Sequence, residues 1–286
     1  MAKFFVDAFA DMFGNELKEN GLELAPSKIK YENKIINFTG WNNKNRETMI
    51  ENLKSGKYSI VHTKQMEWIK FFTPFLEQGE DIAFFTTSLK LFTDGGADLQ
   101  AAFTQLSTDF PTQKVRLINT YTVSRGISKL ATLSHIIYKK ENNFEKAVQF
   151  ATKLAGHFAT AFVVDDYRYI TSNPILKKAG TELVGGLLNV KPIISIDKEG
   201  NFKLLDKVRG FKAGAQKLFE IAKFNGENIA DYTFSIVHSN AQTEAEQLKE
   251  KFLECIDENE IKIVETSLNN SIIVGPKFVG ITFHSK

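Results

Sequence analysis

The amino-acid sequence predicts an α/β protein of two domains. We expect a Rossmann-like N-terminal domain with a mainly parallel sheet flanked by helices, and a C-terminal α+β domain with a mixed sheet. Strand and helix patterns alternate through the first half, which is typical of a parallel sheet with helices on both faces. Hairpin patterns mix with helices in the second half. A chain of 286 residues also exceeds the usual size of one domain, so we place the domains at 1–157 and 158–286.

Each element of the first half has its own pattern of apolar residues. Apolar runs suited to strands cover residues 3–8, 58–62, 81–87 and 114–119. Apolar residues at helical spacing cover residues 45–55, 66–78, 97–109, 126–139 and 144–156. The aromatic side chains that these patterns turn toward the core are Trp68, Phe72, Phe75, Phe84 and Phe103. We expect these five to be mostly buried.

The second half begins with a strand at residues 158–164 and continues into a hairpin. The hairpin strands are residues 189–197 and 202–208, joined by a turn in which Gly200 is free to adopt a positive φ. A helix at 211–224, a strand at 232–238 and a helix at 243–257 follow, and we expect three closing strands. Hairpins mixed with helices favour the α+β class for this half.

Composition excludes several classes of protein. Lys and Arg total 36 against 34 for Asp and Glu, so no strongly basic field suggests nucleic acid. The single cysteine, Cys255, excludes an internal disulfide and a cysteine-based zinc site, and its helical neighbours predict a small packing residue. The apolar start of the chain meets Asp7 too early for a signal peptide, and no apolar run is long enough to span a membrane. We therefore expect a soluble, cytoplasmic protein.

Common catalytic motifs are absent. The sequence contains no GxxxxGK[ST] or GxGxxG loop for nucleotides, no GxSxG elbow and no HExxH pair for zinc. We expect no cofactor, no metal and no catalytic residue. These absences count against an enzyme, and we expect a binding protein.

Polar residues follow several predicted strands of the first half. Asp7, His62, Thr63 and the run ending in Ser88 stand where strands end. In an open parallel sheet, ligands bind at the carboxyl ends of the strands, so these groups suit an amphiphile with a small polar head. Alternatively, Thr63 and Ser88 only cap the helices that follow them.

The segment 187–214, LLNVKPIISIDKEGNFKLLDKVRGFKAG, resembles a recognisable segment of the DegV family. The leucine pair, the Lys-Pro strand, the glycine turn and the Lys-Val-Arg-Gly corner carry this resemblance, which extends over nearly the whole chain. Further matches include the opening strand before Asp7, the run from His62 to Gln65 and the late Gly275-Pro276.

The resemblance implies a two-domain carrier that buries a long-chain fatty acid between its domains and holds the carboxylate with hydroxyl groups. Some members present the lipid to a bacterial fatty acid kinase. The resemblance places Thr63 at the carboxylate, with Ser88 or Thr93 as the second hydroxyl and His62 as the nearest cationic group. It also implies an exposed partner surface at the corner of the hairpin, formed by Lys207, Arg209 and Lys212.

The sequence also departs from the family pattern. Ala8, Lys64 and Phe92 each stand where a serine is usual, and residues 172–175 replace a Gly-Gly-Arg motif. A histidine expected before the final Gly-Pro falls on Ile273 or Val274. Two alternatives therefore stay open: a diverged paralogue that holds another apolar ligand or none, and a Rossmann-like enzyme.

Overall fold

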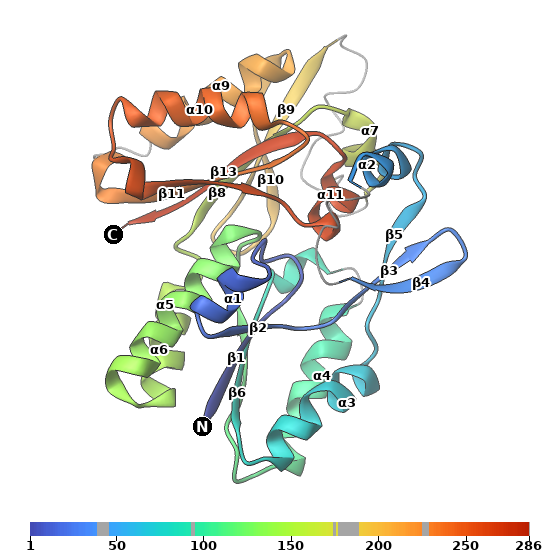
Figure 1. The fold of residues 1–286 in the computed structure, drawn as a ribbon, viewed down its shortest axis with the longest axis vertical. Helices are drawn as coiled ribbons and strands as arrows, with labels where there is room; N and C mark the ends of the chain where they lie inside the picture. Colours follow the sequence, from blue (N-terminus) through green and yellow to red (C-terminus); the bar gives the residue numbers. More distant parts are fainter. Residues whose placement is uncertain (39–45, 93–94, 174–175, 177–188, 225–228, 286) are drawn as a thin grey trace.

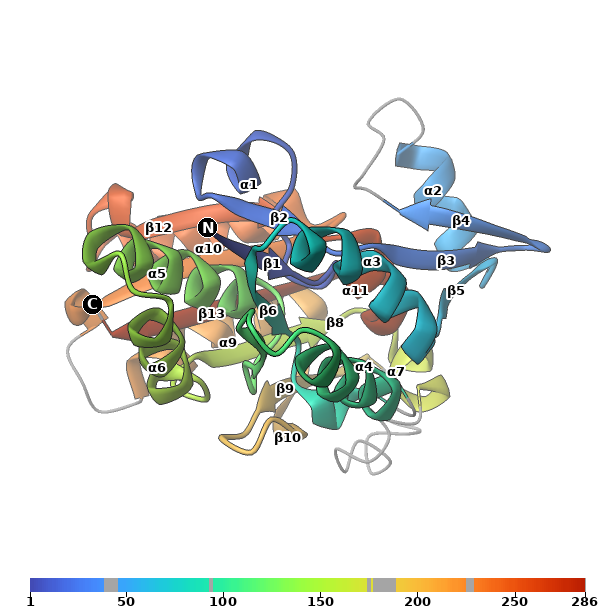
Figure 2. The ribbon, with the colours of Figure 1, turned by 90° about the horizontal axis from the view of Figure 1, so that it is seen from below.

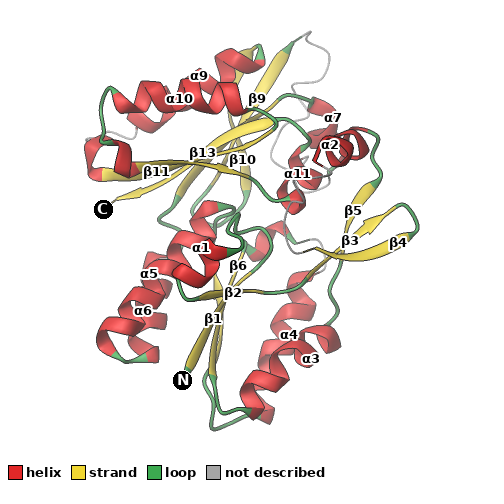
Figure 3. Cartoon of the chain, in the orientation of Figure 1, coloured by secondary structure: helices red, strands yellow, loops and turns green. Residues whose placement is uncertain are grey.

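The computed structural model describes the whole chain except residues 39–45, 93–94, 174–175, 177–188, 225–228 and 286 (Figure 1). The described residues form three sheets. A parallel sheet and a mixed sheet form the two halves of the molecule, and a small antiparallel sheet lies beside both (Figures 1 and 3).

The sheet of the first half is entirely parallel and has the strand order β2-β1-β6-β7. Its strands are β1 (Ala2–Val6), β2 (Leu22–Leu24), β6 (Asp81–Thr86) and β7 (Val115–Asn119). The helices of this half are α1 (Asn15–Glu19), α3 (Gln65–Glu77), α4 (Gly95–Asp109), α5 (Arg125–Glu141) and α6 (Phe144–Leu154). Helices α3 and α4 cover one face, and α5 and α6 cover the other (Figure 2).

Alternation along the strands explains why both faces are apolar. Phe4 and Phe85 pack toward α5 and α6, whereas their neighbours Phe5 and Phe84 pack toward α3 and α4. All four rings are at most 1% exposed. A strand that is covered on both faces therefore has apolar residues at consecutive positions of its sequence.

The predicted aromatic core of this half is largely confirmed. Trp68, Phe72, Phe84 and Phe103 are buried, between 0% and 7% exposed. Phe75 is only half-buried, because it lies at the edge of the cluster that these residues form.

The second half contains a mixed sheet of six strands in the order β10-β9-β8-β13-β11-β12. Its strands are β8 (Ala159–Val164), β9 (Val190–Ile196), β10 (Phe202–Arg209), β11 (Tyr232–Ser239), β12 (Ile261–Glu265) and β13 (Phe278–Ser285). Only β11 and β12 pair in parallel. Its helices are α7 (Tyr167–Ser172), α9 (Phe211–Phe224), α10 (Gln242–Leu253) and α11 (Leu268–Val274). The predicted two-domain α/β fold class is confirmed.

Two expectations for this half are wrong. The three closing strands are two strands with α11 between them, because Ser267 caps a helix by accepting from the Asn270 amide at 3.1 Å. Cys255 is exposed rather than packed. Helix α10 ends at Leu253, so Cys255 lies beyond it and Ile256 occupies the buried position.

The small sheet has the order β4-β3-β5 and was not predicted as a unit. It comprises β3 (Ser27–Tyr31), β4 (Lys34–Phe38) and β5 (Tyr58–Val61), with α2 (Arg46–Lys54) between β4 and β5. The expectation that 58–62 belongs to the parallel sheet is wrong, since β5 pairs antiparallel with β3. Ile29 and Leu53 pack against Leu268 of α11, so this sheet links the two halves.

Candidate functional site

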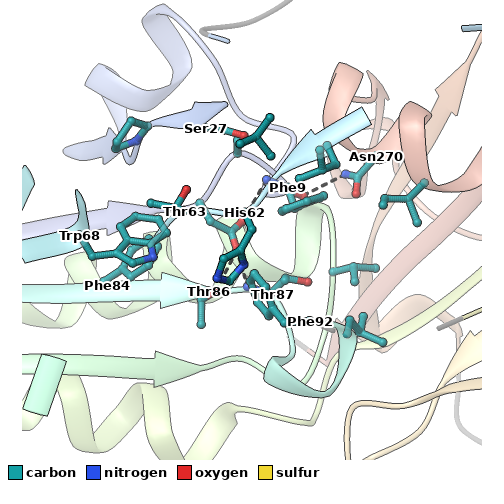
Figure 4. Close-up of a pocket in the computed structure, with 18 of the residues that line it drawn as sticks. Phe9, Ser27, His62, Thr63, Trp68, Phe84, Thr86, Thr87, Phe92 and Asn270 are labelled. Carbon is teal, nitrogen blue, oxygen red and sulfur yellow. Dashed lines mark hydrogen bonds between the residues drawn. The ribbon is translucent and has the colours of Figure 1, made fainter. Parts of the chain in front are cut away.

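A cavity of about 250 Å³ opens where the parallel sheet, the small sheet and the second half meet (Figure 4). This volume lies just under the roughly 300–1,000 Å³ of typical ligand pockets. Most of the lining is apolar. The larger apolar groups are Ile60, Trp68, Phe84, Phe92, Phe202 and Ile273.

Asp7 is the carboxylate of the cavity lining. It follows β1 directly, and its side chain is 6% exposed. Oδ1 accepts from the Phe9 amide at 3.0 Å, and Oδ2 accepts from Thr86 Oγ1 at 3.0 Å and from the Thr87 amide at 2.6 Å. Burial raises the pKa of Asp7 to about 6 although these three hydrogen bonds favour the ionised form.

Two threonines at the end of β6 line the same region. Thr86 donates its hydroxyl hydrogen to Asp7, and Thr87 Oγ1 donates to the Thr122 carbonyl at 3.1 Å. Both hydroxyl oxygens still have lone pairs with which to accept. Figure 4 shows both side chains near His62.

The structure places Thr63 and His62 in the cavity lining, just after β5. Thr63 is half-buried and forms no side-chain hydrogen bond with the described residues. His62 Nε2 lies 2.6 Å from Asp98 Oδ2 of α4, so a carboxylate already occupies one ring nitrogen. The strand before Thr63 is antiparallel, which corrects the expected parallel-sheet position.

The start of α3 offers less to an anion than its position after Thr63 suggests. The Lys64 amide donates to Glu67 Oε2 at 3.0 Å, and the Gln65 amide donates to Asp98 Oδ1 at 3.2 Å. Acidic side chains thus already accept hydrogen bonds from these two backbone amides at the helix N-terminus.

Ser88 does not line the cavity. It is fully buried and caps the short helix η2 (Leu89–Leu91), with the Lys90 amide 3.4 Å from its hydroxyl oxygen. Its hydroxyl packs against the hairpin turn, where a Cβ on Gly200 would overlap it. This supports the capping alternative for Ser88. Thr93 lies outside the described residues.

Asn270 of α11 brings the second half to the cavity. Its Nδ2 donates to the Phe9 carbonyl at 3.0 Å and to Asp11 Oδ1 at 2.9 Å. Asn270 could not be identified from the sequence, because it lies 259 positions away from Asp11, to which it donates. The position of Asp7 at the end of a predicted strand could have identified it from the sequence, but Asp7 was not predicted as a ligand-binding residue.

The cationic corner of the hairpin is exposed at Lys207, Arg209 and Lys212, as expected. The role of this corner as a partner surface stays a prediction. Among the described residues, no group of three His, Cys, Asp or Glu side chains is arranged to hold a metal. No helix in the same part of the chain is both long and apolar enough to cross a membrane.

The family model described as "Uncharacterised protein, DegV family" matches residues 1–286. The chain belongs to the DegV family. It is 22% identical over 279 residues to a DegV domain-containing protein of Streptococcus pyogenes serotype M3, covering 96% of this chain and 95% of that protein. It is 22% identical over 221 residues to a second such protein from Lactococcus lactis, covering 76% and 75%.

Solved DegV structures share the fold. The chain is similar to a DegV protein from Thermus thermophilus described as binding fatty acid, with a TM-score of 0.85, 16% identity and coverage of 100% and 99%. It is also similar to a stearic-acid-binding protein from Eubacterium ventriosum, with a TM-score of 0.85, 18% identity and the same coverage. The resemblance to DegV proteins is thereby confirmed, in a diverged member.

Proposed function

We propose that this DegV protein binds a long-chain fatty acid without acting on it chemically. The cavity between its two halves would take the acyl chain, and the carboxyl group would lie among the hydroxyls near Asp7. The observation that carries the proposal is the lining itself, in which aromatic and aliphatic groups surround a few polar side chains. The two solved structures described above, whose names state fatty-acid or stearic-acid binding, support it.

Thr63 is the strongest candidate for the head-group hydroxyl. It lines the cavity, and no described residue occupies its hydroxyl. Ser88 is no longer a candidate for the second head-group hydroxyl, because it faces Gly200 rather than the cavity. Thr86 and Thr87 take its place, since both line the cavity beside Asp7.

We also propose that the protein presents its bound fatty acid to a fatty acid kinase. The exposed cations Lys207, Arg209 and Lys212 stand at the end of β10 and the start of α9, apart from the cavity lining. A partner bound there would touch the hairpin whose Phe202 lines the cavity. Lipid binding and partner binding would thus use different side chains of one element.

Denaturing mass spectrometry of the purified protein tests the lipid-binding proposal. We expect a co-purified fatty acid, released when the protein unfolds, in roughly equimolar amount. If the protein is empty and no C14–C18 acid binds when added, the proposal fails and the diverged-paralogue alternative gains support. A nucleotide-dependent rise in melting temperature would instead favour the Rossmann-like enzyme, since a ligand at 100 times its Kd adds about 2.7 kcal/mol of stability.

A further inference from the structure

The polar side chains around Asp7 can accept hydrogen bonds from a ligand but have no hydrogen left to donate. Thr63 and Ser27, which also line the cavity, donate no side-chain hydrogen bond to the described residues and keep theirs. Thr86 and Thr87 have given their hydroxyl hydrogens to Asp7 and to the Thr122 carbonyl. Both hydrogens of the Asn270 amide are also committed, to the Phe9 carbonyl and to Asp11. What these side chains offer a ligand is their oxygens, together with the carboxyl group of Asp7.

The charges near the cavity point the same way. Among the described residues that line it there is no Lys and no Arg, and Asp7 is its carboxylate. The groups facing Asp7 that titrate are Asp11 on its own loop and His62 across the cavity, while β6 and α11 present Thr86, Thr87 and Asn270. The Nε2 atom of His62 lies 2.6 Å from Asp98 Oδ2, so this nitrogen already has a partner.

A ligand carboxylate would therefore enter a buried site whose described lining residues include one carboxylate and neither Lys nor Arg. Two like charges in such a place disfavour each other, and the usual result is that one of them takes up a proton. A head group that donates a hydrogen bond also matches the acceptors around Asp7, whereas an anion only adds acceptors.

We propose that this cavity selects apolar chains whose bound head group is uncharged and donates a hydrogen bond. A protonated fatty acid and a fatty alcohol share this chemistry. The inference rests on the proposed function, in that an acyl chain fills the cavity, and it adds that a fatty acid binds together with one proton. The acid is ionised in solution near neutral pH, so this proton is taken from the solvent on binding.

Equilibrium dialysis of the wild-type protein with dodecanoic acid and dodecan-1-ol, between pH 6.5 and 8.5, tests the proposal. Uptake of one proton raises the Kd of the acid by about tenfold per pH unit, while the Kd of the alcohol changes less than about twofold. An acid Kd that stays constant over this range, with the alcohol bound more than about tenfold weaker, would overturn the inference but leave the proposed function standing. Failure of both ligands to bind would overturn both.

Two variants locate the cause. Asp7→Asn removes the resident charge, so we expect the affinity for the acid relative to that for the alcohol to rise by about tenfold or more at pH 8. Asp109→Asn, on the exposed end of α4, is the matched control. Asp7 also accepts hydrogen bonds from two backbone amides, so the Asp7→Asn protein is first checked for a cooperative melting transition.

The second variant, Ile273→Lys, leaves those hydrogen bonds intact and adds a cation to the cavity lining. It should give the same gain in affinity for the acid alone. If a folded Asp7→Asn protein or Ile273→Lys shows no gain for the acid, the charge argument is wrong.

Discussion

Asp7 and Asp11 extend from the same short loop after β1, and both are buried, yet their surroundings differ. Asp11 accepts hydrogen bonds from Thr266 Oγ1 at 3.0 Å, the Ser267 amide at 2.6 Å and Asn270 Nδ2 at 2.9 Å, and also from Ser124. These donors come from the starts of α5 and α11, one in each half of the molecule.

Asp7 has donors from the first half alone, and it lines the cavity. A buried carboxylate surrounded by fixed donors fastens parts of a protein together, because every acceptor position has a protein partner. A buried carboxylate on a cavity wall instead leaves part of its capacity to a ligand. Asp11 thus connects the two halves of the molecule, and Asp7 is the carboxylate that we propose for ligand recognition.

Asp11→Ala should have the largest effect on stability. Removing the carboxylate leaves buried donors from Ser124, Thr266 and Ser267 without an acceptor, so we expect a loss of about 3–5 kcal/mol in the free energy of unfolding. Urea denaturation measures it, with Asp109→Ala as the exposed control expected within about 0.5 kcal/mol of wild type. A loss below about 1 kcal/mol would show that Asp11 does not fasten the two halves.

The pH dependence of stability should identify Asp7. Its pKa is raised from 3.8 to about 6 in the folded protein, so the folded state holds a proton that the unfolded state has released. Its contribution to stability is full below pH 4 and is lost as the pH rises through 6, by on the order of 3 kcal/mol. Burial raises the pKa of Asp11 as well, so the informative quantity is the difference between wild type and Asp7→Asn.

We expect urea denaturation at pH 4.5 and 7.5 to show a larger fall in stability for wild type than for Asp7→Asn. Equal falls in the two proteins would mean that Asp7 is ionised at both pH values and that burial does not dominate its environment.

Thr63→Val should weaken fatty-acid binding and leave the fold intact. A hydrogen bond to a carboxyl head group contributes roughly 1.5–3 kcal/mol when the group is charged, and less when it is neutral. We therefore expect a loss of about tenfold for a fluorescent fatty acid titrated at neutral pH. Full affinity in the variant would remove Thr63 from the head-group site and leave Thr86, Thr87 and Asp7 as its polar groups.

Arg209→Glu should have the smallest effect on the lipid. The side chain is exposed and lies outside the cavity lining, so lipid content by mass spectrometry should equal that of wild type. The free energy of unfolding should change by less than about 0.5 kcal/mol. Loss of lipid would place this cation in the pocket and contradict the assignment of recognition to the Asp7 region.

The parallel sheet and its aromatic core could be predicted because their signals are local. The continuous apolar run of β6 and the helical stripe of α3 each stand in one short stretch of sequence. The family resemblance adds the pairing of the two halves, and it selected Thr63, which does line the cavity.

The remainder depends on contacts between distant residues. The pattern of Tyr58–Val61 predicts a strand but not its sheet, and β5 joins β3 rather than β1 or β6. The apolar run Ile272–Val274 suits a strand, yet the cap at Ser267 starts a helix through it. Ser88 could be assigned to the ligand or to a cap with equal reason, because its neighbour Gly200 is far along the chain.

The contact between Gly200 and Ser88 affects how closely the two halves of the molecule approach each other. Gly200 has a φ of 84°, and the turn that it forms rests on Ser88 and on the backbone of Tyr121, where a Cβ would lie 3.2 Å from the Cα atom. Phe202 follows the turn on one side of this contact, and Leu91 and Phe92 follow Ser88 on the other; all three line the cavity. Because Gly200 has no Cβ, the hairpin of the second half can pack closely against Ser88 and Tyr121 of the first half. A side chain at position 200 would push the two halves apart beside the cavity and so change its width.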